Sequence, residues 1–326
     1  MISLENISIG YHQKEPLLSQ FSPTAGEGEM IALVGRNGTG KSTLLRSILG
    51  LLPFLGGKCL LSGVKLELMN PATRAKSVSY VSSQVSGLPS LTVRELVSLG
   101  RMPHTGWMGK MGKADTDLVD QIIHEVGMEL YMDRSLDQLS DGERQRVMIA
   151  RALVQDTPHI ILDEPAAYLD IPNKYELVRL LSLFRDRGKT IIYSTHDLET
   201  ALMCADKFWV ISDGNIHEGS PEDLGLAGLF NQLFDSSGIS FDLKSGRFTY
   251  TTSSRGELFL SGGSKEEQAW TKHALQRIGY GVNKSSQHLN IEILSGEGPR
   301  WKIEKEGKET IVDSIHMLAR YLIQDV

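Results

Sequence analysis

Runs of apolar residues alternate with helical patterns through the first two thirds of the chain. The apolar runs predict strands at residues 2–10, 29–34, 78–81, 159–162 and 190–193. A helix is expected from about Lys41 to Gly50, directly after a glycine-rich loop. Because fully apolar strands that alternate with helices are typical of a sheet covered on both faces, the pattern predicts a mainly parallel α/β sheet.

Between Leu91 and Leu139 the pattern changes to helix and loop. LTVRELVSLG and DTDLVDQIIHEVG have helical spacing, and Leu118, Ile122 and Val126 form one apolar face of the second segment. The glycine-rich stretch at 106–113 separates the two segments. We interpret residues 91–139 as a helical insertion in the α/β core.

A second change occurs near residues 234–240, after which the pattern becomes hairpin-like. Short antiparallel strands are predicted at 241–250 and 256–262, and a possible capping box of Ser264 and Glu267 predicts the start of a helix. HLNIEIL and WKIEKEGKE predict two more strands. A final helix is expected to carry Ile311, Ile315, Leu318 and Leu322 on one stripe. This order, ββαββα, predicts a small α+β domain at 240–326 after a first domain at 1–235.

Composition and charge narrow the classes of protein that fit. The chain has 326 residues, room for about two domains. A net charge of −6 argues against binding nucleic acid through a broad basic face. The two cysteines, Cys59 and Cys204, match no metal or redox spacing. The N-terminus lacks the features of a secretory signal, and the most apolar run, 48–57, is too short to span a bilayer. We therefore expect a cytoplasmic protein that meets a membrane only through a partner.

The loop after the second predicted strand carries a phosphate-binding pattern. Gly35, Arg36, Asn37, Gly38, Thr39, Gly40, Lys41 and Ser42 fit G-x-x-x-x-G-K-[ST] between a strand and a helix. Backbone N–H groups of such a loop surround phosphate oxygens, and the helix N-terminus adds partial positive charge. Lys41 is expected to reach the β and γ phosphates and Ser42 to ligate Mg²⁺. The alternative is a glycine-rich turn with an incidental lysine.

Two adjacent carboxylates follow the predicted strand at 159–162. Asp163 and Glu164 lie where ligands bind in open α/β sheets, beyond the carboxyl end of a strand. We expect Asp163 to hold Mg²⁺ through water and Glu164 to orient or deprotonate the attacking water. A solvated turn after a strand is the alternative, and the phosphate-binding loop upstream weighs against it.

Three further residues are candidates on weaker grounds. Gln84 follows a strand and can add a neutral oxygen to a Mg²⁺ shell, although a surface loop residue is the simpler interpretation. His196 stands just past the strand at 190–193, where a neutral imidazole can contact the γ-phosphate or serve a structural role. Tyr11 can stack on a purine ring or be an exposed aromatic near the terminus.

LSDGERQRVMIARAL, residues 139–153, has the pattern of a well-capped helix. Ser140 and Glu143 form a capping box, and Val147, Ala150 and Val154 repeat at helical spacing. Capping boxes are common, so this pattern alone predicts no function.

The order of these motifs resembles the ATP-binding subunit of an ABC transporter over residues 1–235. The resemblance rests on the phosphate-binding loop, Gln84, LSDGE at 139–143, LDEP at 162–165, YLD at 168–170 and His196. It implies a P-loop core with an N-terminal antiparallel β part and a helical subdomain, and ATP hydrolysis with ATP and Mg²⁺ bound. It assigns Tyr11 to adenine stacking, Thr43 to ATP binding, Gln84 and Asp163 with Ser42 to Mg²⁺, Asp170 to the inter-subunit loop, and Glu164, His196 and Lys41 to catalysis.

The resemblance also gives LSDGE a role in trans. Ser140, Asp141, Gly142 and Glu143 match the signature motif, which closes over the γ-phosphate bound by a second copy in a head-to-tail homodimer. Asp141 and Glu143 depart from the commonest form, LSGGQ. Because Asp141 adds negative charge near the docking phosphate, we expect its side chain to point away.

LGRMPHTGW, residues 99–107, resembles a segment of importers for iron–siderophore, haem and cobalamin complexes. Its alternative is a helix end at Gly100 with Trp107 packing locally. The resemblance implies membrane-spanning permease subunits and, indirectly, a substrate-binding protein as partners, with the chain peripheral on the inner face of the membrane. A soluble ABC ATPase that acts on nucleic acid or ribosomes and an exporter subunit are the rivals. The role of residues 240–326 stays open between ligand binding, dimerisation and a structural appendage.

Overall fold

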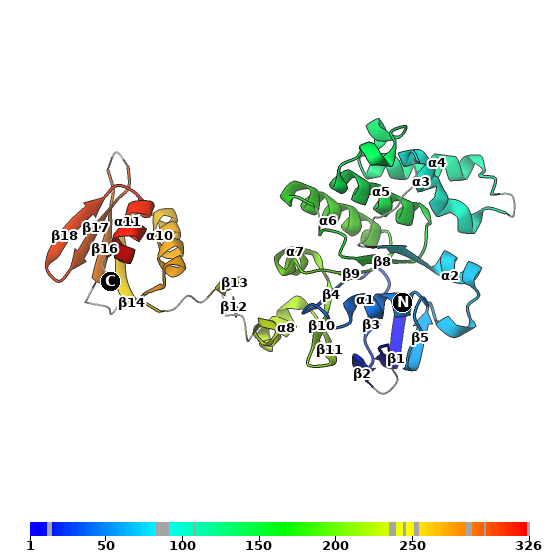
Figure 1. The fold of residues 1–326 in the computed structure, drawn as a ribbon, viewed down its shortest axis with the longest axis horizontal. Helices are drawn as coiled ribbons and strands as arrows, with labels where there is room; N and C mark the ends of the chain where they lie inside the picture. The colour runs from blue at the N-terminus through cyan, green and yellow to red at the C-terminus, as the bar shows by residue number, and fades with distance from the viewer. Residues whose placement is uncertain are drawn as a thin grey trace. The chain divides into compact units, whose positions relative to one another are not determined.

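Figure 1 shows the computed structural model, in which the chain divides into two units, Met1–Ala227 and Gly228–Val326. The described residues are 1–11, 15–82, 91–106, 109–167, 169–234, 239–243, 246–250, 254–283, 289–296 and 298–324. Each unit has its own hydrophobic core. The domain boundary predicted at 235–240 lies within the second unit, and the change of pattern there falls partly outside the described residues.

A mainly parallel sheet forms the centre of the first unit, with strand order β11-β10-β4-β9-β8-β7. Its strands are β4 (Met30–Gly35), β7 (Val78–Val81), β8 (His159–Asp163), β9 (Thr190–Ser194), β10 (Lys207–Ser212) and β11 (Asn215–Gly219). Only the β10–β11 pair is antiparallel. The predicted parallel α/β sheet is confirmed, and β10 with β11 extends it beyond the predicted strands.

A second, antiparallel sheet lies at the N-terminus of the chain. It contains β1 (Ile2–Ile9), β2 (Leu18–Phe21), β3 (Thr24–Ala25), β5 (Gly56–Leu61) and β6 (Val64–Lys65). Helix α1 (Lys41–Ile48) contacts β1, β4 and β8, so it lies between the two sheets. Its Leu44 and Leu45 are fully buried in one core with Ile7 of β1 and Trp209 of β10. This sheet confirms the N-terminal antiparallel β part.

The predicted insertion at 91–139 is helical in the structure. It begins with α3 (Val93–Ser98), η2 (Leu99–His104) and α4 (Lys113–Glu125), and continues through η3 (Glu129–Tyr131) and η4 (Leu136–Gln138) to α5 (Asp141–Val154). Before it lie η1 (Leu66–Leu68) and α2 (Pro71–Ser77). α3, α4 and α5 contact one another and lie together in Figure 1. A Cβ on Gly100 would meet the Arg151 carbonyl at 2.2 Å, so this glycine allows η2 to approach α5 closely. Trp107 lies outside the described residues.

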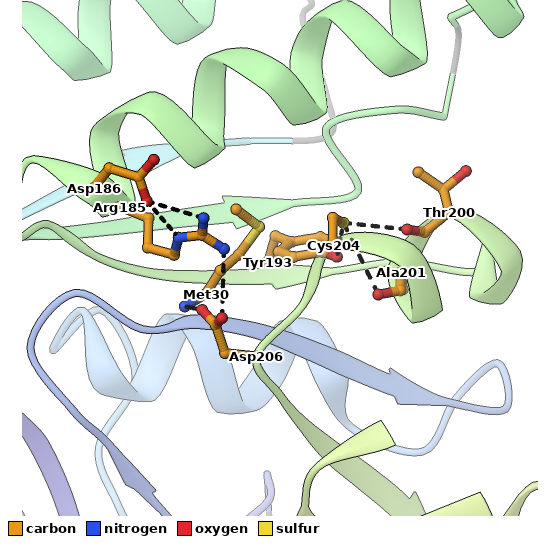
Figure 2. A network of polar contacts seen from close by, with 8 residues as sticks. All are labelled: Met30, Arg185, Asp186, Tyr193, Thr200, Ala201, Cys204 and Asp206. Carbon is orange, nitrogen blue, oxygen red and sulfur yellow. Dashed lines mark hydrogen bonds and ion pairs between the residues drawn. The ribbon is translucent and has the colours of Figure 1, made fainter. Parts of the chain in front are cut away.

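Helix α6 (Ile171–Asp186) covers the other face of the central sheet, followed in the chain by α7 (Leu198–Cys204) and α8 (Pro221–Leu226). Figure 2 shows polar contacts that fix α6 and α7 to the sheet. Arg185 of α6 binds Asp206, which also accepts the N–H of Met30 at the start of β4. Cys204 of α7 lies 3.4 Å from the Tyr193 hydroxyl of β9. These contacts hold α7, and with it the loop that carries His196, against the sheet.

The second unit contains a short hairpin and a five-stranded sheet. α9 (Leu229–Phe234) precedes the hairpin of β12 (Ile239–Asp242) and β13 (Arg247–Tyr250). The sheet has the order β15-β14-β16-β17-β18. Its elements are β14 (Gly256–Gly262), α10 (Lys265–Arg277), β15 (Tyr280–Val282), β16 (Leu289–Leu294), β17 (Arg300–Lys305), β18 (Lys308–Val312) and α11 (Ile315–Gln324). The predicted α+β class is confirmed, but the predicted order ββαββα is wrong: β15 follows α10, and WKIEKEGKE contains two paired strands, β17 and β18, in place of one.

Two further predictions for this unit are wrong. The strand at 256–262 is not antiparallel, because β14 pairs in parallel with both β15 and β16, and the helix α10 makes the crossover that parallel pairing needs. Ile311 is not in the last helix: it lies in β18 opposite Lys302 of β17. The helix starts only after Ser314, whose hydroxyl accepts the Met317 N–H.

Within the described part of the chain, no helix combines the length and the apolar character that crossing a membrane requires.

Candidate functional site

The connection from β4 to α1 carries the predicted ATP-binding residues. β4 is buried up to Val34, and Gly40 then caps α1 with a φ of 102°, a left-handed conformation that favours glycine. The Lys41 ammonium turns back over the loop and donates to the carbonyls of Gly35 at 2.9 Å and Arg36 at 3.2 Å. The Lys41 ammonium therefore lies against the backbone of the loop, bonded to two of its carbonyl oxygens.

Lys41 is a cation in a largely buried place. Only 6% of the residue is exposed. Burial lowers the pKa of the ammonium, while the nearby Glu164 and Asp163 carboxylates oppose this shift. An anion bound in the loop would replace the carbonyl oxygens as the partner of this charge.

The two predicted carboxylates have different environments. Asp163 ends β8 and is 2% exposed, and its Oδ1 accepts from the Ser194 hydroxyl at 2.7 Å and from the Ser42 hydroxyl at 3.1 Å. Glu164, the next residue, has a φ of 50° and points to a more open region. Its N–H donates to the Ser194 hydroxyl at 2.9 Å. Ser194 therefore joins the ends of β8 and β9, and Ser42 joins both to the phosphate-binding loop.

His196 and Glu164 form a contact pair at the same edge of the sheet. The His196 Nε2 lies 2.8 Å from the Glu164 Oε1, and the two side chains are 45% and 31% exposed. They line a shallow pocket whose walls are Glu164, Ala166, Ala167, Lys174, Thr195, His196 and Asp197. A water molecule in this pocket would have a carboxylate and an imidazole within reach.

The residues at this edge fit a Mg²⁺ ion shared with phosphate. The Ser42 hydroxyl and the Asp163 carboxylate share a hydrogen bond, so one ion between them would meet two protein oxygens. Among the described residues, no group of three or more His, Cys, Asp or Glu side chains could hold a metal alone. Magnesium in such a site completes its shell with phosphate and water oxygens. Gln84, the third predicted ligand, lies outside the described residues.

Tyr11 lies next to the start of α1. Its hydroxyl is 3.3 Å from the Thr43 hydroxyl, and 66% of the residue is exposed. An exposed ring anchored beside the phosphate-binding loop has a free face for stacking. The structure therefore brings together Tyr11 and Thr43, two of the residues predicted to bind ATP.

The LSDGE segment forms the predicted capping box at the start of α5. The Ser140 N–H and hydroxyl both donate to the Glu143 Oε2 at 2.8 Å, and the Glu143 N–H donates to the Ser140 hydroxyl at 3.3 Å. These hydrogen bonds hold the pKa of Glu143 below its usual range. The Asp141 side chain is 74% exposed and lies 3.5 Å from Arg144. Gly142 lies in the first turn of the helix. The Ser140 hydroxyl and the Asp141 and Glu143 carboxylates therefore surround this helix N-terminus.

Asp170 caps α6. Its Oδ1 accepts from the Asn173 N–H at 3.1 Å and from the Asn173 side-chain amide at 2.6 Å. Asp170 ends the segment that runs from Glu164 to α6, and Ala166 and Ala167 of this segment form part of the pocket wall.

Comparisons with known proteins agree with this geometry. Residues 18–167 match the family described as "ABC transporter", and residues 255–323 match the "Iron ABC transporter C-terminal domain". FpuC of Bacillus anthracis, a petrobactin import ATP-binding protein, is 37% identical over 221 residues, which cover 67% of this chain and 80% of that protein. The chain belongs to the ABC transporter ATP-binding proteins.

Other similarities support this assignment. FhuC of Bacillus subtilis, an iron(3+)-hydroxamate import ATP-binding protein, is 32% identical to this ABC ATPase over 235 residues. The matched region covers 72% of this chain and 87% of FhuC. The dimeric structure of a bacterial ABC transporter cassette superposes with a TM-score of 0.61 at 27% identity, over 68% of this chain and 98% of that one. The predictions of an ABC fold and of an ATPase are confirmed, while the roles of individual residues stay predictions.

Sequence analysis missed three polar residues of this ABC ATPase, one buried beside the two carboxylates and two in the pocket wall. Ser194 connects Asp163 with Glu164, and Lys174 and Asp197 lie in the same pocket wall as His196. A signal for Ser194 was present, because it is a polar residue that ends an apolar strand just before His196. Nothing in the sequence links Lys174 with Asp197.

Proposed function

We propose that this ABC ATPase hydrolyses MgATP between two copies of itself and thereby drives import of a metal chelate through separate permease subunits. One observation carries the ATPase part: hydrogen bonds and contacts run without interruption from Ser42 through Asp163, Ser194 and Glu164 to His196. This line joins the phosphate-binding loop to the proposed base. Phosphoryl transfer requires positioning and charge stabilisation of this kind.

Each group of the site has a proposed task in hydrolysis. The loop N–H groups and Lys41 bind the β and γ phosphates, and Tyr11 stacks on the adenine. Ser42, Asp163 and Gln84 hold Mg²⁺, which when bound neutralises charge on the phosphates. Glu164 orients the attacking water and accepts its proton, and His196 holds that carboxylate and contacts the γ-phosphate.

The second copy completes the site in this proposal. Ser140 and the N-terminus of α5 bind the γ-phosphate held by the loop of the partner, and Asp170 lies at the contact between copies. The exposed position of Asp141 beside Arg144 supports this arrangement, because its charge is directed to a counterion. The dimeric relative of known structure supports it as well.

Import of a metal chelate is proposed as the transport task. The names of the two relatives and the match of residues 255–323 to an iron transporter domain support an iron chelate over other cargo. The chain would then be peripheral on the inner face of the membrane, with a permease as its direct partner and a substrate-binding protein as an indirect one. Haem and cobalamin complexes belong to the same class of cargo.

The ATPase proposal is tested with Glu164→Gln in the full chain. We expect the variant to bind ATP with wild-type affinity and to lose about 10²- to 10⁴-fold in kcat, the usual contribution of a general base. Glu222→Gln in the first turn of α8 is the control, because this exposed residue lies outside the site. Wild-type turnover by Glu164→Gln would contradict the role of Glu164.

The transport proposal is tested by affinity purification from detergent-solubilised native membranes, followed by reconstitution of the co-purified subunits in vesicles. We expect a multi-spanning permease to co-purify and ATP to drive a radiolabelled ferric chelate across the bilayer towards the ATPase side. Transport in the opposite direction would make the protein an exporter subunit. Recovery of ribosomal or DNA-bound proteins without a permease would contradict the transport proposal.

A further inference from the structure

An ion pair joins the first turn of α6 to the N-cap residue of α7. The Lys174 Nζ lies 2.8 Å from the Asp197 Oδ2, and each side chain is 28% exposed. Both residues lie in the wall of the pocket that contains Glu164 and His196. The pair therefore lies beside the proposed ATPase site.

The lysine belongs to the same helix start as Asp170. Asp170 caps α6, and the Lys174 N–H donates to the Asp170 carbonyl at 2.9 Å in the first turn. Because helical hydrogen bonds fix this turn, a shift of Asp170 moves Lys174 with it. The proposed contact with the second copy is made at this turn.

The aspartate belongs to the loop that carries His196. Asp197 follows His196 directly and caps α7, with its Oδ1 accepting the Thr200 N–H at 3.1 Å. Its own N–H donates to the Thr195 hydroxyl at 3.0 Å. His196 thus lies between Thr195 and Asp197, which this hydrogen bond joins, and the Asp197 carboxylate anchors the segment to α7 and to Lys174.

The surroundings of Asp197 favour its charged form, as an ion pair with Lys174 requires. Burial raises the pKa of Asp197, but the hydrogen bonds from Lys174 and the Thr200 N–H lower it by more. The net pKa therefore lies below the ordinary value. Partly buried pairs are screened less by salt than exposed ones.

We propose that Lys174 is a positioning residue of the ATPase site, which through Asp197 couples the loop carrying His196 to the helix start carrying Asp170. Lys174 touches neither phosphate nor water in this proposal. It acts by setting where His196 lies relative to Glu164, so engagement of Asp170 by the second copy is transmitted to the histidine. The inference rests on the proposed ATPase function.

The test uses full-length Lys174→Met, Asp197→Asn and the double variant. Asparagine caps helices as well as aspartate does, so Asp197→Asn removes the charge and keeps the cap of α7. Lys189→Met is the matched control, because Lys189 lies just past the other end of α6 and pairs with Asp156 at 2.6 Å, far along the chain from Asp170. ATP hydrolysis, binding of a fluorescent ATP analogue and the melting temperature are measured for each.

A misplaced catalytic group can lower the reaction rate up to about 10²-fold. We expect Lys174→Met to lower kcat about 10-fold and to leave the dissociation constant and KM for ATP unchanged. Asp197→Asn should lower kcat equally, and the double variant no further. Lys174→Arg should restore most of the activity. Melting temperatures should stay within about 4 °C of wild type, as for a single ion pair.

Wild-type kcat in Lys174→Met would overturn the inference. Losses that multiply in the double variant would also overturn it, since the two residues would then act independently. If wild type hydrolyses ATP and Glu164→Gln does not, these results count against the coupling alone. If wild type shows no ATPase activity, the proposed function itself fails.

Discussion

Ser194 joins the Asp163 side chain to the Glu164 backbone, and loss of its hydroxyl should uncouple these two residues. Its hydroxyl is fully buried, donates to the Asp163 Oδ1 at 2.7 Å and accepts the Glu164 N–H at 2.9 Å. Ser194→Ala removes this single oxygen and leaves both partners in place. Asp163 keeps the hydrogen bond from Ser42, whereas the described contacts offer the Glu164 N–H no second acceptor.

The cost follows from the two hydrogen bonds. A bond to a charged carboxylate contributes about 1.5–3 kcal/mol, and a buried N–H left without an acceptor costs about 1–3 kcal/mol. We therefore expect Ser194→Ala to destabilise the region around β8 and β9 by about 3 kcal/mol. Because Glu164 loses the contact that holds its left-handed backbone, we expect kcat to fall by up to about 10²-fold.

Hydrogen exchange of peptides from β8 and β9, read by mass spectrometry, measures the local opening free energy. The expected loss corresponds to a fall in protection of about 100-fold. Ser47→Ala is the matched control, because Ser47 is equally buried and its hydroxyl has no hydrogen-bond partner in the described part of the chain. Equal protection in the two variants would refute the role of the Ser194 hydroxyl.

Three further variants test other parts of the chain. Burial lowers the pKa of His159 from 6.5 to about 4, so the unfolded chain binds more protons between these values. The unfolding free energy should therefore fall by about 3 kcal/mol as pH drops from 6.5 to 4, and urea titrations of His159→Gln should lack this loss. Thr271→Val leaves the buried Trp301 indole N–H, now 2.9 Å from the Thr271 hydroxyl, without an acceptor. It should destabilise the second unit by about 1–3 kcal/mol in thermal unfolding, and an unchanged unit would contradict this. Glu143→Gln removes a negative charge beside Ser140, so the KM for ATP should fall with little change in stability; a higher KM would count against docking of phosphate there.

The strands of the central sheet could be predicted because each carries its signal locally. β4, β8 and β9 are apolar along almost their whole length, as expected for strands covered on both faces. Pairing between distant strands has no such signal, which explains the wrong direction predicted for β14. Ile311 was misplaced because it continues the spacing of the last helix by chance, although Ser314 marks the boundary.

The site could be predicted as far as its motifs are contiguous in the chain. The phosphate-binding loop and the two carboxylates each follow one strand, so strand and motif together predict their place. The distances from Glu164 to His196 and from Asp163 to Ser194 depend on how β8 and β9 pair. The Lys174–Asp197 pair depends on how two helices pack, which composition and periodicity do not encode.

The left-handed backbone at Glu164 sets fold stability against chemistry at one residue. A non-glycine residue in this conformation costs roughly 1 kcal/mol, and glycine would remove the cost. Substitutions that most improve stability here would thus abolish the proposed base. In a lineage no longer selected for ATP turnover, we expect glycine or asparagine to replace glutamate at this position. Such a residue in an otherwise intact cassette would mark a subunit that no longer hydrolyses ATP.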